Sequence, residues 1–478
     1  MENYQKFYID GQWVEPIDAT PFDVINPATE EVVARTSLGS AADVDRAVAA
    51  ARSAFETFSG WSVKDRVSLL ERVIEQYERR FGDIAWAITT EMGSPISFSR
   101  GLQTPATLGH LRAAIAVLKD FKFEYMLGRT RILREPIGVC GFITPWNWPI
   151  NQITAKLGGA LAAGCTMVVK PSEYAPLSPV ILTEILAAAG VPPGVFNLVN
   201  GDGPTVGSAI SKHPGIDMVS FTGSTAAGIT VARDAAATVK RVHQELGGKS
   251  ANILLSGRHM EKSVPYGMIR AFTNSGQSCI APARMLVPEA EVGHVVNLIK
   301  SASKAFVVGD PRSPDTTHGP VVNGRQYDRV QKLIKSGIDE GARLVIGGEG
   351  RPAGCNRGYF VQPTVFADVT PGMRIAREEI FGPVLTIIGY RDVDHAVEIA
   401  NDSIYGLAGF VSADDIKDAD TVGRRIRAGR IYLNDLPQDE TPTYEFEAPF
   451  GGYKQSGNGR EVGLFGFEEF HEVKAVIA

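Results

Sequence analysis

The sequence has few cysteines, no basic excess and no long apolar run, and each absence excludes a class of protein. Four cysteines occur among 478 residues, far apart and without paired spacing: Cys140, Cys165, Cys279 and Cys355. This pattern fits neither a disulfide framework nor a zinc ribbon, and it favours a reducing compartment. The 48 basic and 54 acidic residues give a net charge of −6, which disfavours nucleic acid as a partner.

No apolar run approaches the roughly 18 residues that a membrane-spanning helix needs. The segment from Met1 to Asp10 lacks the basic and apolar regions of a secretory signal peptide. We therefore expect a cytoplasmic protein that has no membrane partner. With 44% hydrophobic and 21% charged residues, the chain is long enough to form two or three domains, each with its own core.

The first part of the chain changes from short strands to helices. Residues 1 to about 40 contain short apolar segments interrupted by turns. Ser40 and Asp43 then have the spacing of a capping box, which predicts a helix whose apolar positions recur over 44–55. An apolar stripe over 67–81 predicts a second helix.

From Gly138 onward, short apolar strands alternate with helical segments, which is typical of parallel βαβ units. The predicted strands of a first series are 138–143, 167–169, 196–199 and 218–221. Those of a second series, which begins near Ala251, are 251–255, 285–287, 344–346, 384–388 and 431–433. Two tandem α/β domains follow, with a cleft between them and ligands at the carboxyl ends of the strands.

A cysteine within a turn of small residues is the first candidate for chemistry. Cys279 lies in the stretch Phe272–Arg284, between Gly276 and Pro282. Such a turn exposes a thiolate and lets another molecule approach it closely, as a nucleophile requires. A buried structural thiol is the commoner fate of a free cysteine, and this stretch alone leaves both interpretations open.

Several motifs along the chain carry a resemblance to a known family. They are Thr144–Pro149, Glu245–Ser250, Phe272–Arg284, Glu379–Pro383 and Pro449–Ser456. In this order they closely resemble the NAD(P)-dependent aldehyde dehydrogenase superfamily, over nearly the whole chain. One position departs from the family pattern, because the residue before the motif glutamate is usually small or apolar and here is Gln244. Its amide could add a hydrogen bond near Glu245.

The resemblance implies a domain organisation. It predicts two Rossmann-like parallel-sheet domains, the NAD-binding one over 1–117 and 135–246 and the catalytic one over 247–449. A small β arm over 118–134 and 450–478 is expected to join subunits into a homodimer or homotetramer. The segment 468–477 agrees with this expectation, since it has the pattern of an exposed strand that needs a partner edge.

A strand, a glycine turn and a helix start follow one another over Phe221–Gly228, and such a helix start suits a phosphate. The spacing is not the usual dinucleotide fingerprint, so alone it indicates only a tight turn. A carboxylate at a strand end, Glu173, would bind ribose hydroxyls and repel a 2′-phosphate, which favours NAD over NADP. The resemblance implies these cofactor-binding residues: Ile143, Thr144, Pro145, Trp146, Lys170, Ser172, Glu173, Gly203, Phe221, Thr222, Gly223, Ser224, Leu246, Gly247, Glu379 and Phe381.

The same resemblance implies a mechanism for aldehyde oxidation. Cys279 attacks the aldehyde carbon, and the oxyanion is held by the Asn147 amide and the Cys279 backbone NH. After hydride transfer, water activated by Glu245 hydrolyses the thioester. Lys156 and Glu461 are expected to relay the proton to solvent.

Other functions are less favoured. The eight histidines form no recognisable pair or motif with Cys279, so neither a Cys-His hydrolase nor a metal site is expected. Transfer of the acyl group to coenzyme A is disfavoured by the presence of Glu245. A non-catalytic structural member of the fold is disfavoured because the thiol and the glutamate are both present. A semialdehyde or betaine-type aldehyde dehydrogenase is the alternative within the family.

The substrate is expected to be an aromatic or medium-chain aldehyde. The predicted pocket walls are Trp148, Gln152, Ala155, Thr273 and Ile280, with the loop 434–448 at the mouth. Ala155 and Thr273 are modest in size and leave a roomy apolar pocket. The loop carries five carboxylates: Asp435, Asp439, Glu440, Glu445 and Glu447. They would repel an anionic substrate, or they simply form a solvated loop surface.

Overall fold

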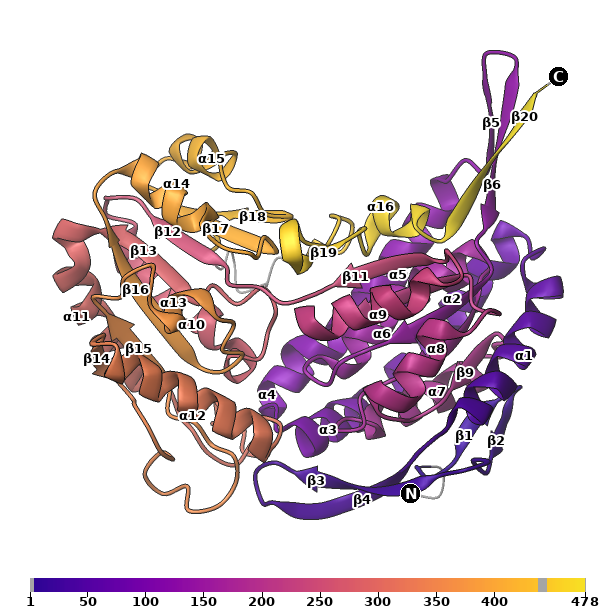
Figure 1. The fold of residues 1–478 in the computed structure, drawn as a ribbon, viewed down its shortest axis with the longest axis horizontal. Coiled ribbons are helices and arrows are strands. Elements are labelled where there is room, and N and C mark those ends of the chain that lie inside the picture. Colours follow the sequence, from indigo (N-terminus) through magenta and orange to yellow (C-terminus); the bar gives the residue numbers. More distant parts are fainter. Residues whose placement is uncertain (1–3, 437–444, 478) are drawn as a thin grey trace.

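Two lobes, each built on its own β-sheet, make up the body of the molecule (Figure 1). The computed structural model describes residues 4–436 and 445–477. A three-stranded sheet projects from one lobe and ends near the carboxyl terminus. The predicted α/β class, with two parallel-sheet units and a β arm, is confirmed. Across the described residues, no helix is long and apolar enough to cross a membrane.

The first lobe contains an eight-stranded sheet. In sheet order its strands are β19 (Gly457–Asn458), β11 (Arg241–Glu245), β10 (Met218–Thr222), β7 (Val139–Ile143), β8 (Thr166–Lys170), β9 (Phe196–Leu198), β1 (Phe7–Ile9) and β2 (Gln12–Val14). Strands β11 to β9 run parallel, whereas β19, β1 and β2 join antiparallel. The sequence pattern predicts β7 to β10 but not β11, because residues 241–245 are mostly polar or charged.

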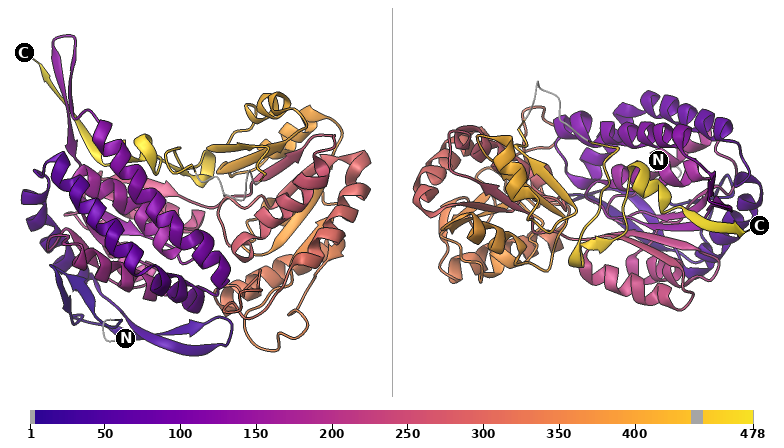
Figure 2. Two further views of the ribbon diagram at one scale, coloured as in Figure 1. Left: turned by 180° about the vertical axis from the view of Figure 1, so that it is seen from behind. Right: turned by 90° about the horizontal axis from the view of Figure 1, so that it is seen from above.

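Helices cover both faces of this sheet (Figure 2). Successive side chains of a strand point to opposite faces, so each central strand contributes to two cores. Val139 packs in one core with Val48 of α1 (Ala41–Phe58), and Cys140 packs in the other with Leu157 of α6 (Pro149–Ala163). The remaining helices of the lobe are α2 (Val63–Arg79), α3 (Phe81–Met92), α4 (Ile96–Phe98), a π-helix η1 (Ser99–Gln103), α5 (Thr104–Asp120), α7 (Leu177–Ala188), a π-helix η2 (Gly203–Gly207), α8 (Ser208–Lys212) and α9 (Thr225–Ala236).

The predicted start of α1 is confirmed. The Ser40 backbone NH donates to Asp43 Oδ2 at 2.9 Å, as a capping box requires. The predicted second helix is interrupted, because α2 ends at Arg79 and Phe81 begins α3. An apolar stripe that continues across a short break cannot reveal the break.

The second lobe contains a seven-stranded sheet. In sheet order its strands are β14 (Arg343–Ile346), β15 (Thr364–Ala367), β16 (Val384–Tyr390), β13 (Arg284–Pro288), β12 (Ala251–Leu254), β17 (Ala408–Ser412) and β18 (Arg430–Leu433). Strand β14 runs antiparallel to β15, and the other neighbours are parallel. Strands β15 and β17 are absent from the sequence prediction.

Helices also surround the second sheet. They are α10 (Met260–Phe272), η3 (Thr273–Gly276), η4 (Glu289–Glu291), α11 (Val292–Ala302), η5 (Ser303–Ala305), α12 (Gly324–Asp339), α13 (Arg374–Arg377), α14 (Val393–Asn401) and α15 (Ile416–Gly423). The chain then returns to the first lobe through η6 (Lys454–Ser456), β19 and α16 (Gly463–Glu468). The segment 450–478 is therefore shared between the large sheet and the arm.

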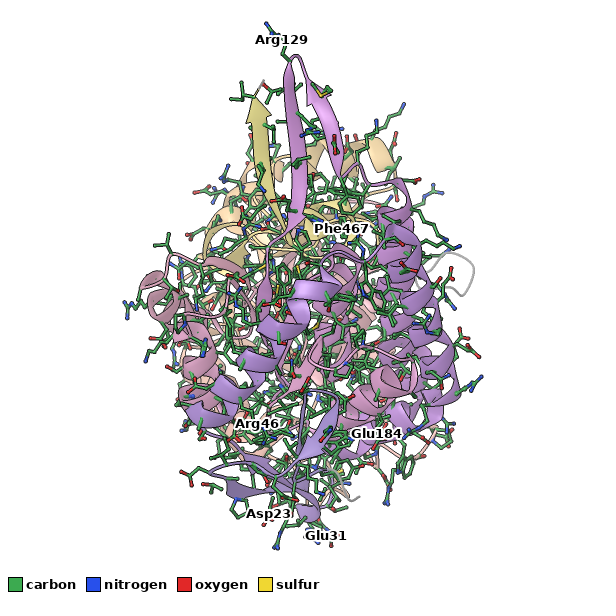
Figure 3. All side chains as sticks on the ribbon, turned by 90° about the vertical axis from the view of Figure 1, so that its right-hand side faces the viewer. Asp23, Glu31, Arg46, Arg129, Glu184 and Phe467 are labelled. Carbon is green, nitrogen blue, oxygen red and sulfur yellow. The ribbon has the colours of Figure 1, made fainter. Side chains whose placement is uncertain are left out.

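The arm consists of β5 (Glu124–Leu127), β6 (Thr130–Pro136) and β20 (His471–Ile477), in the order β20-β6-β5. Arg129 lies at its outer end and Phe467 at its base (Figure 3). Phe467 is buried against Phe121 and His471, which fixes the root of the arm to the body. At the opposite end lies a separate hairpin of β3 (Thr20–Asn26) and β4 (Glu31–Leu38).

Candidate active site

Cys279 lies between two hollows of different character. One is an apolar cavity of about 120 Å³, and the other is a cleft of about 890 Å³ between the lobes. Cys279 lines both, so its thiol is accessible from two sides. Of the two interpretations of this cysteine, the structure favours the accessible thiol over the structural one.

The loop before Cys279 has an unusual backbone. Asn274 and Ser275 in η3 have φ of 56° and 55°, a left-handed conformation that is rare outside glycine. Gly276 follows at φ 73°, and a Cβ there would lie 2.1 Å from the Gly382 carbonyl oxygen. Only glycine fits at this position. The turn of small residues seen in the sequence is therefore required by the close approach of another segment.

Glu245 ends β11 and lies beside Cys279. It is 1% exposed, and apart from the Cys279 thiol neither carboxylate oxygen has a hydrogen-bond partner among the described residues. Burial raises the pKa of Glu245 to about 8, and the Glu461 carboxylate adds to this rise. Burial, followed by the Glu245 carboxylate, also raises the pKa of the Cys279 thiol well above its usual range. At neutral pH both groups therefore rest mainly in their protonated forms.

Two glycines after Glu245 allow the close approach of the two motifs. A Cβ on Gly248 would lie 2.3 Å from the Cys279 carbonyl oxygen. The Gly248 backbone NH donates to Glu379 Oε1 at 2.8 Å, which brings a third motif to the same place. The spacing of the motifs along the sequence does not predict these contacts.

Gln244 does not contact the Glu245 side chain. Its Nε2 donates to the Gly228 carbonyl at 2.6 Å, and Asn458 Nδ2 donates to its Oε1 at 3.5 Å. Adjacent residues of a strand point to opposite faces, so Gln244 faces α9 while Glu245 faces the site. The expected hydrogen bond near Glu245 is therefore wrong.

Asn147 lies at the Cys279 loop, where the sequence predicts an oxyanion donor. Its Nδ2 donates to the Gln277 carbonyl at 3.1 Å, and its buried Oδ1 has no partner in the described chain. The neighbouring Trp148 donates through Nε1 to Ser278 Oγ at 3.0 Å. The Thr144–Pro149 motif thus holds the two residues before Cys279.

Lys156 and Glu461 form a buried ion pair, although 305 positions separate them in the sequence. Lys156 Nζ also donates to Thr222 Oγ1 at 2.7 Å. Burial disfavours the ionised form of Glu461, but the Lys156 charge and hydrogen bond, together with His243 and His110, outweigh this effect and lower the Glu461 pKa. The carboxylate therefore stays charged near Glu245, which is one reason why the Glu245 pKa is raised.

His243 belongs to the same cluster and was not identified from the sequence. Its Nδ1 lies 3.7 Å from Glu461 Oε1 and 3.0 Å from Ser220 Oγ. Burial, with a contribution from Lys156, lowers the pKa of His243 to about 4, so the ring is neutral and forms no ion pair. A single histidine on a polar strand gives no signal in the sequence that it lies beside Lys156 and Glu461.

The cleft collects about half of the predicted cofactor residues. Those lining it are Pro145, Trp146, Thr222, Gly223, Ser224, Leu246, Gly247, Glu379 and Phe381. Ser224 caps α9, where its Oγ accepts from the Ala227 NH at 3.3 Å. The Trp146 and Phe381 rings meet edge to face, with centroids 5.5 Å apart. Phe381 has φ 59°, so its ring is placed by a strained backbone.

The other predicted cofactor residues lie outside the cleft lining. Ile143 and Phe221 are buried in the core of the first lobe. Lys170 donates to the Pro171 and Gly201 carbonyls, at 2.7 Å and 2.9 Å, and its Nζ is 3.8 Å from Glu173. Thr144, Ser172 and Gly203 are likewise absent from the lining. Glu173 is also absent from it, and its side chain is 20% exposed.

The structure adds residues to the cleft that the sequence did not predict. They are Tyr174, Asn323, Arg325, Gln326, Asp328, Arg329, Lys332, Leu333, Arg374 and Glu378. Most belong to α12, whose polar face reads in sequence as an ordinary solvated surface. Only its position opposite β10 makes that face part of a site.

The apolar cavity contains every predicted pocket residue: Trp148, Gln152, Ala155, Thr273 and Ile280. It also includes unpredicted residues from distant segments: His110, Asn151, Arg270, Arg430, Tyr432, Phe446, Phe450 and Val462. Phe446 packs edge to face on His110, with ring centroids 5.1 Å apart. Aromatic walls with a few polar groups suit a largely apolar ligand.

The acidic loop at the mouth differs from the expectation. Asp435 lies 2.9 Å from Arg270 Nε, and both side chains are mostly buried. Arg430 donates to the Glu445 carbonyl at 3.1 Å. Arg270 and Arg430 thus contact this loop, which contains no arginine. The Asp435 carboxylate is paired with Arg270, so it is not a free negative charge. Positions 439 and 440 of the expected acidic cluster lie outside the described residues.

Comparison with known proteins gives one consistent result. A model of the Aldehyde dehydrogenase family matches residues 13–476. A 3-succinoylsemialdehyde-pyridine dehydrogenase from a Pseudomonas species is 54% identical, over 100% of this chain and 99% of its own length.

Solved structures agree. A cysteine-to-alanine variant of aldehyde dehydrogenase C from Pseudomonas syringae, complexed with NAD+ and octanal, aligns with a TM-score of 0.97 and 52% identity. The alignment covers 100% of this chain and 97% of that chain. A betaine aldehyde dehydrogenase variant from Staphylococcus aureus, in complex with NAD+, aligns with a TM-score of 0.95 and 33% identity, over 99% and 96% of the two chains.

Proposed function

This chain belongs to the aldehyde dehydrogenase family and oxidises aldehydes with NAD, and from this premise we propose the residues that perform the reaction. Cys279 is the nucleophile, and Glu245 is the base for the hydrolytic step. The observation that carries the proposal is the pairing of the partly exposed Cys279 with the buried Glu245. The thiol and a carboxylate that no other described group hydrogen-bonds lie together where a large polar cleft meets a small apolar cavity.

The cleft suits the dinucleotide. Its volume of about 890 Å³ is that of a cofactor site, and the amino terminus of α9 offers backbone NH groups to a phosphate beside Gly223. The Trp146 and Phe381 rings provide apolar walls, and Glu379 provides a carboxylate for ribose hydroxyls. When bound there, NAD supplies the acceptor for hydride.

Preference for NAD over NADP rests on Glu173. This carboxylate is partly exposed beside Lys170 at the end of β8 and would repel a 2′-phosphate. Glu173→Ser is expected to raise kcat/KM for NADP relative to NAD. The ratio of the two kcat/KM values, measured for wild type and variant, tests this assignment. A wild type that already prefers NADP contradicts it.

The chemical steps follow from the residues around the thiol. The Cys279 thiol gives up its proton to solvent water, and the sulfur adds to the aldehyde carbon. The developing oxyanion is stabilised by Asn147 Nδ2 and the Cys279 backbone NH. Loss of hydride leaves a thioester on Cys279. Glu245 then removes a proton from water, which attacks the thioester and releases the acid and the free thiol.

The Lys156–Glu461 pair is proposed to carry the proton away from Glu245. Support comes from its burial, its hydrogen bond to Thr222 and the effect of the Glu461 charge on the Glu245 pKa. A buried ion pair of this kind is weak evidence for stability, so a functional role explains its presence better.

The decisive experiment is Cys279→Ala. Turnover is expected to fall below about one-thousandth of the wild-type rate, since the covalent step is lost. NAD binding, measured by quenching of protein fluorescence, is expected to stay nearly unchanged, because Cys279 is only one part of the lining of a large cleft. Residual turnover above that level contradicts the nucleophile role.

The substrate is proposed to be an aromatic or medium-chain aldehyde. Aromatic rings and aliphatic carbons dominate the small cavity around Trp148 and Phe446. Relatives named for a pyridine-bearing semialdehyde and complexed with octanal support both classes. We expect a higher kcat/KM for benzaldehyde or hexanal than for acetaldehyde or succinic semialdehyde. A clear preference for succinic semialdehyde contradicts the apolar character of the site.

The arm is proposed to join subunits into a homodimer or homotetramer, and the two lobes to act as cofactor and catalytic domains. Met126, Leu127, Val473 and Ile477 are exposed apolar side chains on strands β5 and β20, the two outer strands of the arm sheet. Removal of the segment after Gly463 is expected to give monomers or aggregates by light scattering. An unchanged oligomer contradicts the proposal. A cytoplasmic location is supported by the four cysteines, all of which are free thiols.

A further inference from the structure

Asn274 connects the catalytic loop to the segment that holds Asn147. The Asn274 side chain is 5% exposed, and its Nδ2 donates to the Asn147 carbonyl at 2.9 Å and to the Gln277 carbonyl at 3.3 Å. Its Oδ1 accepts from Gln103 Nε2 at 3.2 Å. One buried amide therefore links three segments that are far apart in the sequence.

The orientation of this amide is fixed by its neighbours. Gln103, at the end of the π-helix η1, can only donate through Nε2, so Asn274 Oδ1 must face it. The Asn274 Nδ2 group then faces two carbonyl oxygens, which accept and cannot donate. A flipped amide would place oxygen against oxygen, and the observed pose is therefore the only one that satisfies these contacts.

The backbone of Asn274 is held as tightly as its side chain. Its left-handed φ of 56° is tolerated by asparagine better than by most residues. Its carbonyl accepts from Gln277 Nε2 and from the Gln277 backbone NH, each at 3.1 Å. Gln277 Oε1 accepts in turn from the Val322 NH at 2.9 Å. The loop that ends in Cys279 is thus closed on itself and fastened to the second lobe.

Both proposed oxyanion donors depend on this arrangement. Asn147 Nδ2 is directed by its bond to the Gln277 carbonyl, and the Asn147 backbone is held by Asn274. The Cys279 backbone NH follows Gln277 by two residues in the same loop. A side chain that lines neither hollow therefore helps to set the distance between the two donors, beside the direct bonds from Asn147 and Trp148 to the loop.

We propose that Asn274 is a positioning residue for the oxyanion site, acting through Asn147 and the Cys279 loop. This inference rests on the proposed function, since it presumes that those two groups stabilise the oxyanion. Misplacement of such donors by a fraction of an ångström weakens stabilisation of the transition state more than binding of the substrate.

The test is Asn274→Asp. The change keeps the size of the side chain and its tolerance of a left-handed backbone, but it replaces the donor with an oxygen that repels two carbonyls. The pre-steady-state burst of NADH reports the steps through hydride transfer. We expect its rate constant to fall about 10- to 100-fold, with KM for the aldehyde and Kd for NAD little changed.

A matched control is available in β9. Asn197 is fully buried, donates through Nδ2 to the Met167 and Gly194 carbonyls, and accepts from the Asp10 NH. This is the same bonding pattern as that of Asn274. Asn197, however, lies in β9 of the first lobe and is far from Cys279 in the sequence. Asn197→Asp is expected to lower Tm as Asn274→Asp does while leaving the burst rate near wild type. Equal loss of burst rate in both variants overturns the proposal.

A double-mutant cycle with Asn147→Ala separates a positioning role from a general defect. If Asn274 acts in part through Asn147, then Asn274→Asp causes a smaller loss of burst rate in the Asn147→Ala background than in the wild-type background. Losses that multiply overturn the inference. If Asn274→Asp does not fold, Asn274→Gly, which accepts the same φ without strain, serves in its place. A wild-type burst in Asn147→Ala alone refutes the oxyanion role itself, and thus the proposed function rather than this inference.

Discussion

Two buried carboxylates occupy opposite kinds of environment in the first lobe. Glu91 lies where α3 meets the start of α7, and Glu245 lies at the end of β11. Their exposures are 0% and 1%. Glu91 accepts hydrogen bonds from the Leu177 NH, the Ser178 NH and Ser178 Oγ, whereas Glu245 has only the Cys279 thiol as a partner within the described chain. Equal burial therefore does not mean equal function.

The difference shows how the protein uses an unsatisfied group. Burial raises the pKa of Glu91 to about 7, and the bonds from Ser178 and Leu177 limit the rise. Burial raises the pKa of Glu245 to about 8, and here Glu461 adds to it. A carboxylate whose two oxygens both accept hydrogen bonds from one helix start fastens two helices. One whose only partner is a thiol is available to that thiol or to a water molecule.

The largest effect is expected for a substitution of Glu245, and it should distinguish the function of Glu245 from that of Glu91. Glu245→Gln is expected to lower steady-state turnover by about 1000-fold or more, because thioester hydrolysis loses its base. The first turnover should survive as a burst of about one NADH per active site, and Tm should not fall. Stopped-flow absorbance and thermal melts measure both. If the burst disappears too, Glu245 is needed earlier, to activate the thiol.

Glu91→Ala should show the reverse behaviour. It leaves three buried donors at the start of α7 without an acceptor, so the free energy of unfolding should fall by about 3 kcal/mol. Denaturant titration measures this loss, and kcat below the melting range should stay within about twofold of wild type. A large loss of kcat with intact stability would place Glu91 in the chemistry and end the contrast.

The pH dependence of the two sites should differ in kind. Ionised Glu245 is the active form, so turnover limited by hydrolysis should rise as pH passes about 8. Glu461→Gln removes a negative charge that raises the Glu245 pKa, and the midpoint should move to lower pH. A pH–rate profile of kcat for wild type and variant measures the shift. An unchanged midpoint means that Glu461 does not act on Glu245.

For Glu91 the pH effect concerns stability. A carboxyl whose pKa is raised on folding stabilises the native state most when it is protonated, and this contribution is lost as pH rises towards and through about 7. Wild type should therefore lose stability relative to Glu91→Gln, which cannot ionise, between pH 5 and pH 8. Denaturant titrations of both proteins at the two values measure the change. A constant difference contradicts the raised pKa.

The smallest effect is expected at the neighbour of the base. Gln244→Leu removes a hydrogen bond to the Gly228 carbonyl on the face away from Glu245. Stability should fall by about 1 kcal/mol, and the midpoint of the pH–rate profile should stay in place. The same denaturant titration and profile serve as readouts. A displaced midpoint would show that Gln244 influences the base through the sheet.

Local pattern was sufficient for the parts of the fold that depend on nearest neighbours. The capping box at Ser40 and the long apolar strands β7 and β16 are encoded in a few consecutive residues, and the sequence predicts them. Strand β11 is not predicted, because its polar residues are tolerated only where β19 and α9 cover it. The wrong expectation for Gln244 has the same origin, since the face that a side chain takes depends on strand pairing.

The sequence by itself determined the family, through the order of five motifs, and with it the expectation that Cys279 and Glu245 carry the chemistry. Only the tertiary structure decided how that chemistry is placed. It brings Lys156 to Glu461, turns the polar face of α12 towards the cleft and sets Asn274 between Asn147 and Gln277. The physical reason is that a hydrogen bond or charge effect acts over a few ångströms, whereas the residues that share it lie up to hundreds of positions apart in the chain.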